Sequence, residues 1–217
     1  DVGAAPHPED LYAFHEVAQD QGALPSTAEE LARARAAFDR DGLVVFSRGL
    51  EAEAGALREA VLALRNGTNV EFKEALLAGS ERRGGAPPDY TNGDKDPWVQ
   101  YEAGTPASGP LDPACVARMR KIMGFSAYSK TIRDRAVHHE RLVAAVAACL
   151  GRSEAAPELF QDMALLKPGG GGREKPWHQD AAYFNMGADA RVVGCWIALD
   201  AATPANGCLV FERGGHR

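Results

Sequence analysis

In the first two thirds of the chain, apolar residues recur every three or four positions, a spacing that predicts amphipathic helices. The clearest case begins after Ser26-Thr27-Ala28-Glu29, which reads as a capping box, and continues to about Arg40. Leu31, Ala34 and Phe38 then share one face of this helix. The same spacing predicts helices in four further stretches, residues 9–20, 52–65, 114–121 and 134–150.

Short apolar runs bounded by Gly, Pro or Asn predict strands. One such run, residues 43–46, follows the helix-breaking pair Asp41-Gly42. Three others lie in the last third of the chain, at residues 159–166, 192–199 and 208–211, with a turn at residues 203–207 between the last two. Helices first and strands later favour an α+β fold with an antiparallel sheet or barrel and a mainly β core.

Residues 79–110 form a long irregular stretch that is rich in Gly, Pro, Asp and Asn. Long loops in compact domains are often functional. The aromatic residues Tyr90, Trp98 and Tyr101 would suit a lid or a substrate wall. A plain surface loop explains the same composition equally well.

Composition bounds the class of protein. With 217 residues, 45% of them hydrophobic and 25% charged, we expect one globular domain over residues 1–217, helical and loop-rich in 1–155 and strand-rich in 156–217. The formal net charge of -6 argues against binding to nucleic acid or to a membrane surface. No stretch reaches the roughly 18 apolar residues of a membrane helix. Four cysteines without a CxxC pair favour a reducing, intracellular compartment, and we expect the cytoplasm.

Candidate metal ligands occur in the run Lys175-Pro176-Trp177-His178-Gln179-Asp180. In a strand, residues i and i+2 point to the same face, so His178 and Asp180 would project together. An imidazole nitrogen and a carboxylate oxygen are two of the three ligands of a facial triad, which holds iron(II) with open positions. A single His-x-Asp is weak support, because it arises by chance in many proteins. A zinc hydrolase is a poorer interpretation, because no general base stands beside the pair.

Further motifs surround this triplet in a fixed order. They are Gln161-Asp162-Met163, Lys167-Pro168, Ala181-Ala182-Tyr183-Phe184, Trp196 and Asn206-Gly207-Cys208-Leu209-Val210. With them, the chain from about Phe160 to Arg217 resembles the phytanoyl-CoA dioxygenase family. The opening of the chain, a helix followed by Asp41-Gly42 and an apolar run, is similar to the family's N-terminal pattern. The resemblance implies a double-stranded β-helix, a jelly-roll or cupin-like barrel, flanked by N-terminal helices.

The resemblance also implies a reaction. His178 and Asp180 would be iron(II) ligands, and the catalytic pair, of a 2-oxoglutarate-dependent dioxygenase. Such an enzyme uses molecular oxygen to convert 2-oxoglutarate to succinate and carbon dioxide while it hydroxylates a small-molecule substrate, with ascorbate as a reductant. Family members act on acyl-CoA thioesters, amino-acid-like solutes or specialised metabolites. The carboxylate of Asp180 argues against a halogenase variant, which lacks that ligand.

Four more residues match positions that lie beside the cosubstrate in the family. Gln179 is the middle residue of the triplet, and Met163 and Trp196 would line the 2-oxoglutarate pocket. Lys121 would contact the cosubstrate, although its match is looser. Three of them have a plainer alternative, since Met163 and Trp196 could be core residues and Lys121 a solvated lysine at a helix end.

The third iron ligand departs from the family pattern. The family continues through a Pro-Gly-Ser-His run, which here is Arg213-Gly214-Gly215-His216. The distal histidine of the family, and the arginine that pairs with 2-oxoglutarate, come tens of residues later. The resemblance therefore implies a barrel that continues beyond Arg217. Two alternatives stay open: His216 as third ligand of a rearranged site, or an inactive jelly-roll module that binds a ligand without turnover.

Overall fold

The computed structural model describes residues 11–13, 20–90, 94–105, 109–151, 156–169, 174–184, 186–187 and 190–217. Its α-helices are α1 (Ala28–Asp41), α2 (Glu51–Arg65), α3 (Val70–Arg82), α4 (Pro113–Val116), α5 (Lys130–Ile132) and α6 (Glu140–Leu150). Short helical turns are η3 (Ser126–Tyr128), η4 (Arg133–Val137), η5 (Asp180–Tyr183) and η6 (Pro204–Asn206). The strands are β1 (Leu11–Ala13), β2 (Trp98–Tyr101), β3 (Met119–Met123), β4 (Met163–Leu165) and β5 (Val210–Glu212).

Helix α1 confirms the helix predicted to continue to about Arg40, and its capping box lies one residue later than predicted. The Thr27 hydroxyl accepts a hydrogen bond from the Glu30 backbone N–H, at 3.2 Å. The Glu30 carboxylate in turn accepts bonds from the backbone N–H groups of Ser26 (2.7 Å) and Thr27 (3.1 Å). These bonds, with the Ser26 hydroxyl, lower the pKa of Glu30 to about 2. The carboxylate is thus in its charged form at the positive end of the helix.

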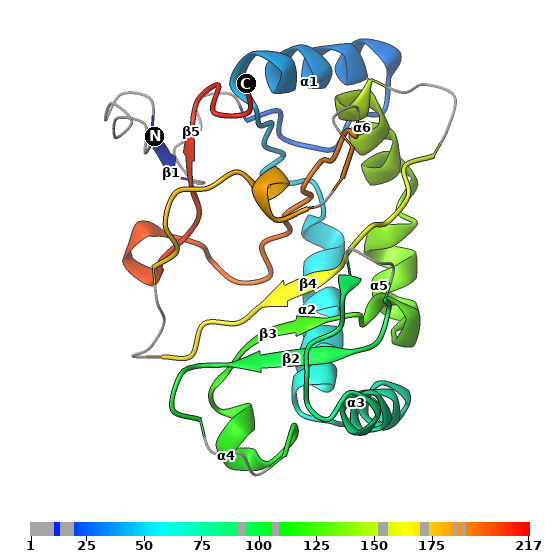
Figure 1. Ribbon diagram of the computed structural model, residues 1–217. Helices are drawn as coiled ribbons and strands as arrows, with labels where there is room; N and C mark the ends of the chain where they lie inside the picture. The colour runs from blue at the N-terminus through cyan, green and yellow to red at the C-terminus, as the bar shows by residue number, and fades with distance from the viewer. Residues whose placement is uncertain are drawn as a thin grey trace.

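The central sheet has the order β2-β3-β4, and both pairs of strands are antiparallel (Figure 1). Val99, Ile122 and Ala164 are cross-strand partners, so their side chains share one face. Val99 and Ile122 are buried in the hydrophobic core, and Ala164 packs against it. This face is therefore the inner face of the sheet, and the alternate residues of the same strands form the outer face.

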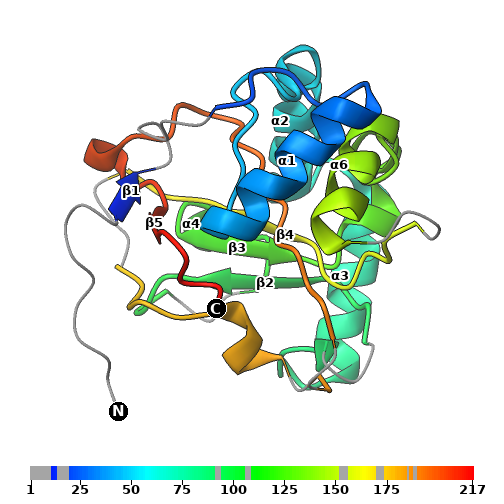
Figure 2. The ribbon, with the colours of Figure 1, turned by 90° about the horizontal axis from the view of Figure 1, so that it is seen from above.

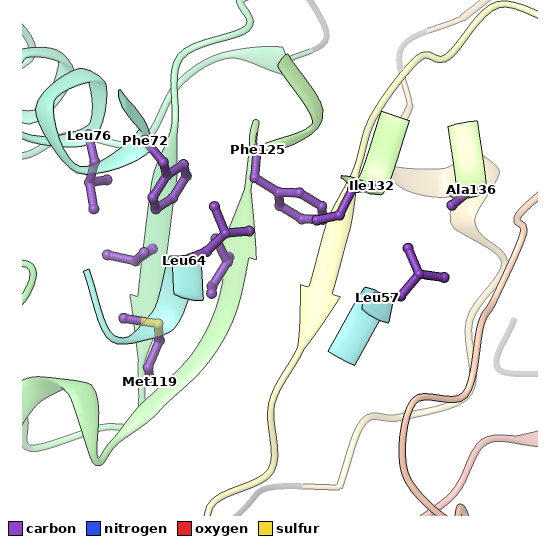
Figure 3. Packing of buried hydrophobic residues seen from close by; sticks show 10 residues of the cluster. Leu57, Leu64, Phe72, Leu76, Met119, Phe125, Ile132 and Ala136 are labelled. Carbon is purple, nitrogen blue, oxygen red and sulfur yellow. The ribbon is translucent and has the colours of Figure 1, made fainter. Parts of the chain in front are cut away.

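Helices α2 and α3 cover the inner face of the sheet. Figure 3 shows their apolar side chains meeting the residues of the strands and of the turns that follow β3. The cluster consists of Leu57, Leu64, Phe72, Leu76, Val99, Met119, Ile122, Phe125, Ile132 and Ala136. Leu64, Phe72 and Ile122 are fully buried. None of the described helices has the length and apolar composition that crossing a membrane needs.

Helices α1 and α6 pack side by side at one end of the molecule (Figures 1 and 2). Their buried apolar positions are small: Ala34 and Ala37 on α1, and Ala145 and Cys149 on α6. The Arg35 guanidinium also donates to the carbonyl oxygen of Ala148, at 2.9 Å. Small side chains at such contacts allow two helices to approach closely.

The α+β class is confirmed, but several predicted elements are not. Residues 43–46 form no strand, and Val45 makes only an isolated bridge with Asp20. Residues 192–199 form no strand either; they enter neither of the described sheets, although Ile197 and Leu199 pack against the core cluster. The described strands form two small antiparallel sheets, β1-β5 and β2-β3-β4, which do not close into a barrel. The jelly roll therefore stays a prediction from the resemblance.

Three further segments differ from the sequence predictions. The helix expected over residues 114–121 is the short α4 followed by β3, because residues 119–123 pair with strands on both sides. The stretch expected to be irregular from residue 79 contains the end of α3 and all of β2. Strand β1 lies where a helix was expected over residues 9–20, the rest of which falls outside the described residues except Asp20. Helix α2 lies where the apolar spacing predicts it, whereas α6 begins at Glu140, six residues after the predicted start, and α3 was not predicted.

The hydrophobic core predicts that alanine substitutions at two leucines of neighbouring helices will lower the free energy of unfolding by very different amounts. Leu64 is 0% exposed, whereas Leu77 is 42% exposed. We expect Leu64→Ala to lower the free energy of unfolding by about 2–5 kcal/mol, because it removes buried methyl groups and leaves a cavity. Leu77→Ala is the matched control and should cost about 0.5 kcal/mol or less. Urea denaturation measures both, and equal losses would contradict the assignment of the core.

Candidate functional site

The outer face of the central sheet, turned away from α2, carries the candidate site. Cross-strand pairing places Gln100, Lys121 and Leu165 in one row of this face. The neighbouring row contains Trp98, Met123 and Met163. Figures 1 and 2 show η5 on this side of the sheet, with α2 on the other. The sheet thus separates the hydrophobic core from the segment that bears the His-x-Asp triplet.

His178 and Asp180 converge, although they lie in a loop and not in the strand that the sequence predicts. Asp180 begins the single turn η5, and His178 precedes it without regular secondary structure. Nε2 of His178 lies 3.4 Å from Oδ1 of Asp180. The two side chains are 35% and 71% exposed, so the pair opens to solvent.

The second nitrogen of His178 fixes its tautomer. Nδ1 lies 2.7 Å from the carbonyl oxygen of Pro176, and because a carbonyl only accepts, Nδ1 is the donor. In the neutral ring, Nε2 then presents a lone pair towards the Asp180 carboxylate. Two acceptors that face each other are stabilised by a cation or a proton between them. A backbone carbonyl that orients a histidine in this way is typical of metal-binding sites.

The spacing of the two donor atoms fits a metal ion. Two neighbouring ligand atoms about 2.1 Å from one ion, at right angles, lie about 3.0 Å apart. The separation of 3.4 Å between Nε2 and Oδ1 is close to this value. One nitrogen and one carboxylate oxygen are also ligands that iron(II) accepts in a facial triad. The residues present therefore fit two of the three protein positions.

Tyr183 lies directly against the histidine. Its ring meets the His178 ring edge to face, with centroids 5.4 Å apart and an interplanar angle of 86°. The η5 turn brings it there, because Ala182 N–H donates to the Gln179 carbonyl at 3.1 Å and tightens the chain. Tyr183 is 66% exposed, so most of its ring faces outward beside the pair. Tyr183 belongs to the run Ala181-Ala182-Tyr183-Phe184 that directly follows Asp180, and its predicted position beside the site is confirmed by this contact.

Lys121 is the cation next to the pair. It lies in the middle of β3, so the interpretation as a solvated helix-end lysine is wrong. Burial lowers the pKa of its ammonium group, and the positive charges of Lys175 and Arg120 lower that pKa further. The Asp180 carboxylate acts in the opposite direction. The structure thus brings Lys121 within electrostatic reach of Asp180 and crowds it with two other cations.

The other predicted cosubstrate residues have different surroundings. Met163 lies on the outer face, 39% exposed, next to the row that contains Lys121. Gln179 donates a hydrogen bond from Nε2 to the carbonyl oxygen of Gly215. Trp196 is half-buried in a segment without regular secondary structure. The roles of all three beside a cosubstrate stay predictions.

Asp162 has a structural role that the sequence does not reveal. Its carboxylate accepts hydrogen bonds from the backbone N–H groups of Phe125 (3.1 Å) and Ser126 (2.7 Å). These groups follow β3, whereas Asp162 directly precedes β4. The carboxylate therefore ties the start of β4 to the end of β3 and helps to fix Met163 on the outer face.

His216 lies against α1. Its ring centroid is 6.3 Å from that of Phe38, with an interplanar angle of 45°. Within the described parts of the chain, no group of three or more His, Cys, Asp or Glu side chains gathers into a metal site. His216 therefore does not join His178 and Asp180 as a third ligand in this structure.

Comparison with known proteins gives one family and several relatives. Residues 38–217 match the family model described as phytanoyl-CoA dioxygenase (PhyH). Similar proteins include phytanoyl-CoA dioxygenase domain-containing protein 1 of Bos taurus, which is 42% identical over 83 residues. The aligned residues cover 38% of this chain and 28% of that protein. The protein of the same name from Danio rerio is 44% identical over 61 residues, covering 28% and 21%. The match thus spans less than a third of these relatives. No solved structure matches the chain significantly.

Burial of Lys121, together with the nearby charges of Lys175 and Arg120, predicts that this lysine lowers stability. Because its pKa is lowered in the folded chain, the penalty is fully present below that pKa and disappears as the pH rises towards 10.5. We expect Lys121→Met to raise the free energy of unfolding at neutral pH, and this gain to shrink at alkaline pH. Lys73→Met, the same change on the exposed face of α3, is the control. Denaturant titrations at several pH values measure both, and a loss of stability in Lys121→Met would refute the argument.

Proposed function

Because the chain belongs to the phytanoyl-CoA dioxygenase family, we propose that it acts as an iron(II)- and 2-oxoglutarate-dependent dioxygenase that hydroxylates a small organic molecule. The observation that supports this proposal most directly is the convergence of His178 Nε2 and Asp180 Oδ1, 3.4 Å apart. The orientation of His178 by the Pro176 carbonyl leaves Nε2 free to bind a metal ion. When bound, iron(II) supplies the redox chemistry that couples molecular oxygen and 2-oxoglutarate to a substrate C–H bond.

The residues around the pair suit an anionic cosubstrate. Lys121 lies beside Asp180 and is crowded by Lys175 and Arg120. A dicarboxylate at this place would offset the repulsion among the three cations, so its binding would be favoured electrostatically. Lys121 would act as a charge partner of one carboxylate, and Gln179 would lie next to both metal ligands.

The outer face of the sheet also offers apolar contact. Met163 and Leu165 are 39% and 52% exposed, and both belong to β4. Exposed apolar side chains beside charged groups are typical of ligand sites that bind a carbon chain and orient its polar end. We therefore propose that these two side chains exclude water from one side of a bound organic molecule.

A second candidate function belongs to a different class. Among the residues that the structure describes, no third histidine or carboxylate joins the pair, and Asp180 is 71% exposed. These observations favour a binding or regulatory module that recognises a small anion without turnover. Metal content and turnover separate the two candidates.

The proposal predicts that both members of the pair are needed for the metal. In the full-length protein, His178→Ala and Asp180→Ala should each abolish stoichiometric iron(II) binding, because each removes a ligand. Both side chains are partly exposed, so the free energy of unfolding should change little. His138→Ala, at an exposed histidine, is the control and should bind iron like the parent protein. Calorimetric titration under anaerobic conditions gives the stoichiometry, and unchanged binding in both variants would rule out the site.

Turnover distinguishes the enzyme from the binding module. The full-length protein, supplied with iron(II), 2-oxoglutarate, ascorbate and oxygen, should release succinate slowly even without its substrate. Asp180→Ala should reduce this release to the level without protein. Iron and 2-oxoglutarate that bind without any release of succinate, across candidate acyl-CoA and amino-acid-like substrates, would favour the binding module instead.

A further inference from the structure

Residues 213–217, here called the clamp segment, close over the end of α1. The last turn of a helix leaves backbone carbonyl groups without partners. Gly214 N–H donates to the carbonyl oxygen of Asp41 at 2.9 Å, and the Arg217 guanidinium donates to that of Asp39 at 2.8 Å. The clamp segment thus supplies the donors that the end of α1 lacks.

The Asp41 side chain strengthens this attachment. Its carboxylate is only 9% exposed and lies at the negative end of the helix dipole, where a second negative charge is unfavourable. It is stabilised by Arg40, at 2.6 Å and 3.0 Å, and by Nε of Arg213 in the clamp segment, at 3.6 Å. A buried carboxylate is costly unless cations pair with it. The Asp41 carboxylate, which is unfavourable at this end of the helix without a cation, therefore holds Arg213 against α1.

The absence of a side chain at Gly42 leaves room for the His216 imidazole. Gly42 has φ 82°, and a Cβ added there would lie 2.5 Å from Nδ1 of His216. The imidazole thus fills the space that any side chain at position 42 would need, and it faces the Phe38 ring. The pair Asp41-Gly42 and the residues Arg213 and His216 form one contact, although some 170 residues separate them in the sequence.

The clamp segment reaches the candidate metal site through one hydrogen bond. The Gly215 carbonyl oxygen, between Arg213 and His216, accepts from Nε2 of Gln179. Gln179 lies between His178 and Asp180 in the chain, so its side chain and theirs leave the same short stretch of backbone. Holding Gln179 therefore restricts the backbone from which both metal ligands project.

We propose that Asp41, Arg213 and His216 are positioning residues, which fix the clamp segment on α1 and, through Gly215 and Gln179, the relative placement of His178 and Asp180. The effect on a metal rests on the proposed function. The mechanical coupling between Arg213 and Gln179 does not, because it concerns the metal-free protein alone.

The first test is made by NMR on the full-length protein without metal. The side-chain amide signal of Gln179, assigned by its loss in Gln179→Ala, reports the bond to Gly215. In Arg213→Ala this signal should shift towards that of a free glutamine side chain, and in Arg213→Lys it should shift less. Arg33→Ala removes an exposed ion pair with Glu29 on the same helix and should leave the signal unchanged. An unchanged signal in Arg213→Ala would overturn the inference.

The second test is a double-variant cycle with Mn(II) as the probe metal. Arg213→Ala and Gln179→Ala should each weaken Mn(II) binding about tenfold, as loss of a supporting contact does in other metal sites. Gln179→Ala removes the donor to Gly215 at an exposed position and adds no charge, so it keeps the test valid if Arg213→Ala fails to fold. Both substitutions interrupt the same chain of contacts from Arg213 through Gly215 to Gln179, so their effects should not add. The double variant should therefore also bind Mn(II) about tenfold more weakly than the parent protein. A loss of about a hundredfold would mean independent effects and overturn the inference. If the parent protein binds no Mn(II), the proposed function fails and the NMR result alone decides the coupling.

Discussion

Burial of the inner face of the β2-β3-β4 sheet against α2 and α3 is the constraint on which the rest of the structure depends. Ile122 lies at its centre, paired across the sheet with Val99 and Ala164, and is 0% exposed. Because side chains alternate along a strand, burial of these three residues sends Lys121 and Met163 to the opposite face. The register that fills the core thus also places the cation and the apolar side chains of the candidate site.

The parts of the fold that depend on local chemistry could be predicted from the sequence. Helices α1 and α2 lie within two residues of their predicted bounds, because capping residues and apolar spacing act within a few positions. Strand β3 could not be predicted, since residues 119–123 become a strand through partners that lie far away in the sequence. The apolar run at 192–199 was misleading because a strand also needs hydrogen-bonded partner strands, which an apolar pattern does not reveal. Its residues Ile197 and Leu199 pack on the core without entering a ladder.

In the candidate site, too, some features could be predicted from the sequence and others depend on the fold. The spacing of His178 and Asp180 predicted that the two would meet, and they do, but through the loop before η5 and not through a strand. The approach of Lys121 depends on the fold of the sheet, so its identification came from the family resemblance and not from a pattern in the residues. Tyr183 and Gly215 lie within runs that the sequence singles out, but those runs do not show that Tyr183 contacts His178 or that the Gly215 carbonyl accepts from Gln179. Family membership, shown by the match over residues 38–217, supplied what local patterns could not.

Strand β4 is an edge of the central sheet in the described part of the chain, and its side chains Met163 and Leu165 are well exposed. An edge strand presents unpaired N–H and C=O groups, and an apolar surface beside them makes it a template for another strand. An uncovered β4 edge therefore favours self-association at high protein concentration. A charged residue introduced at Leu165 would act as a gatekeeper against self-association, at the cost of the apolar contact that the outer face offers to a ligand.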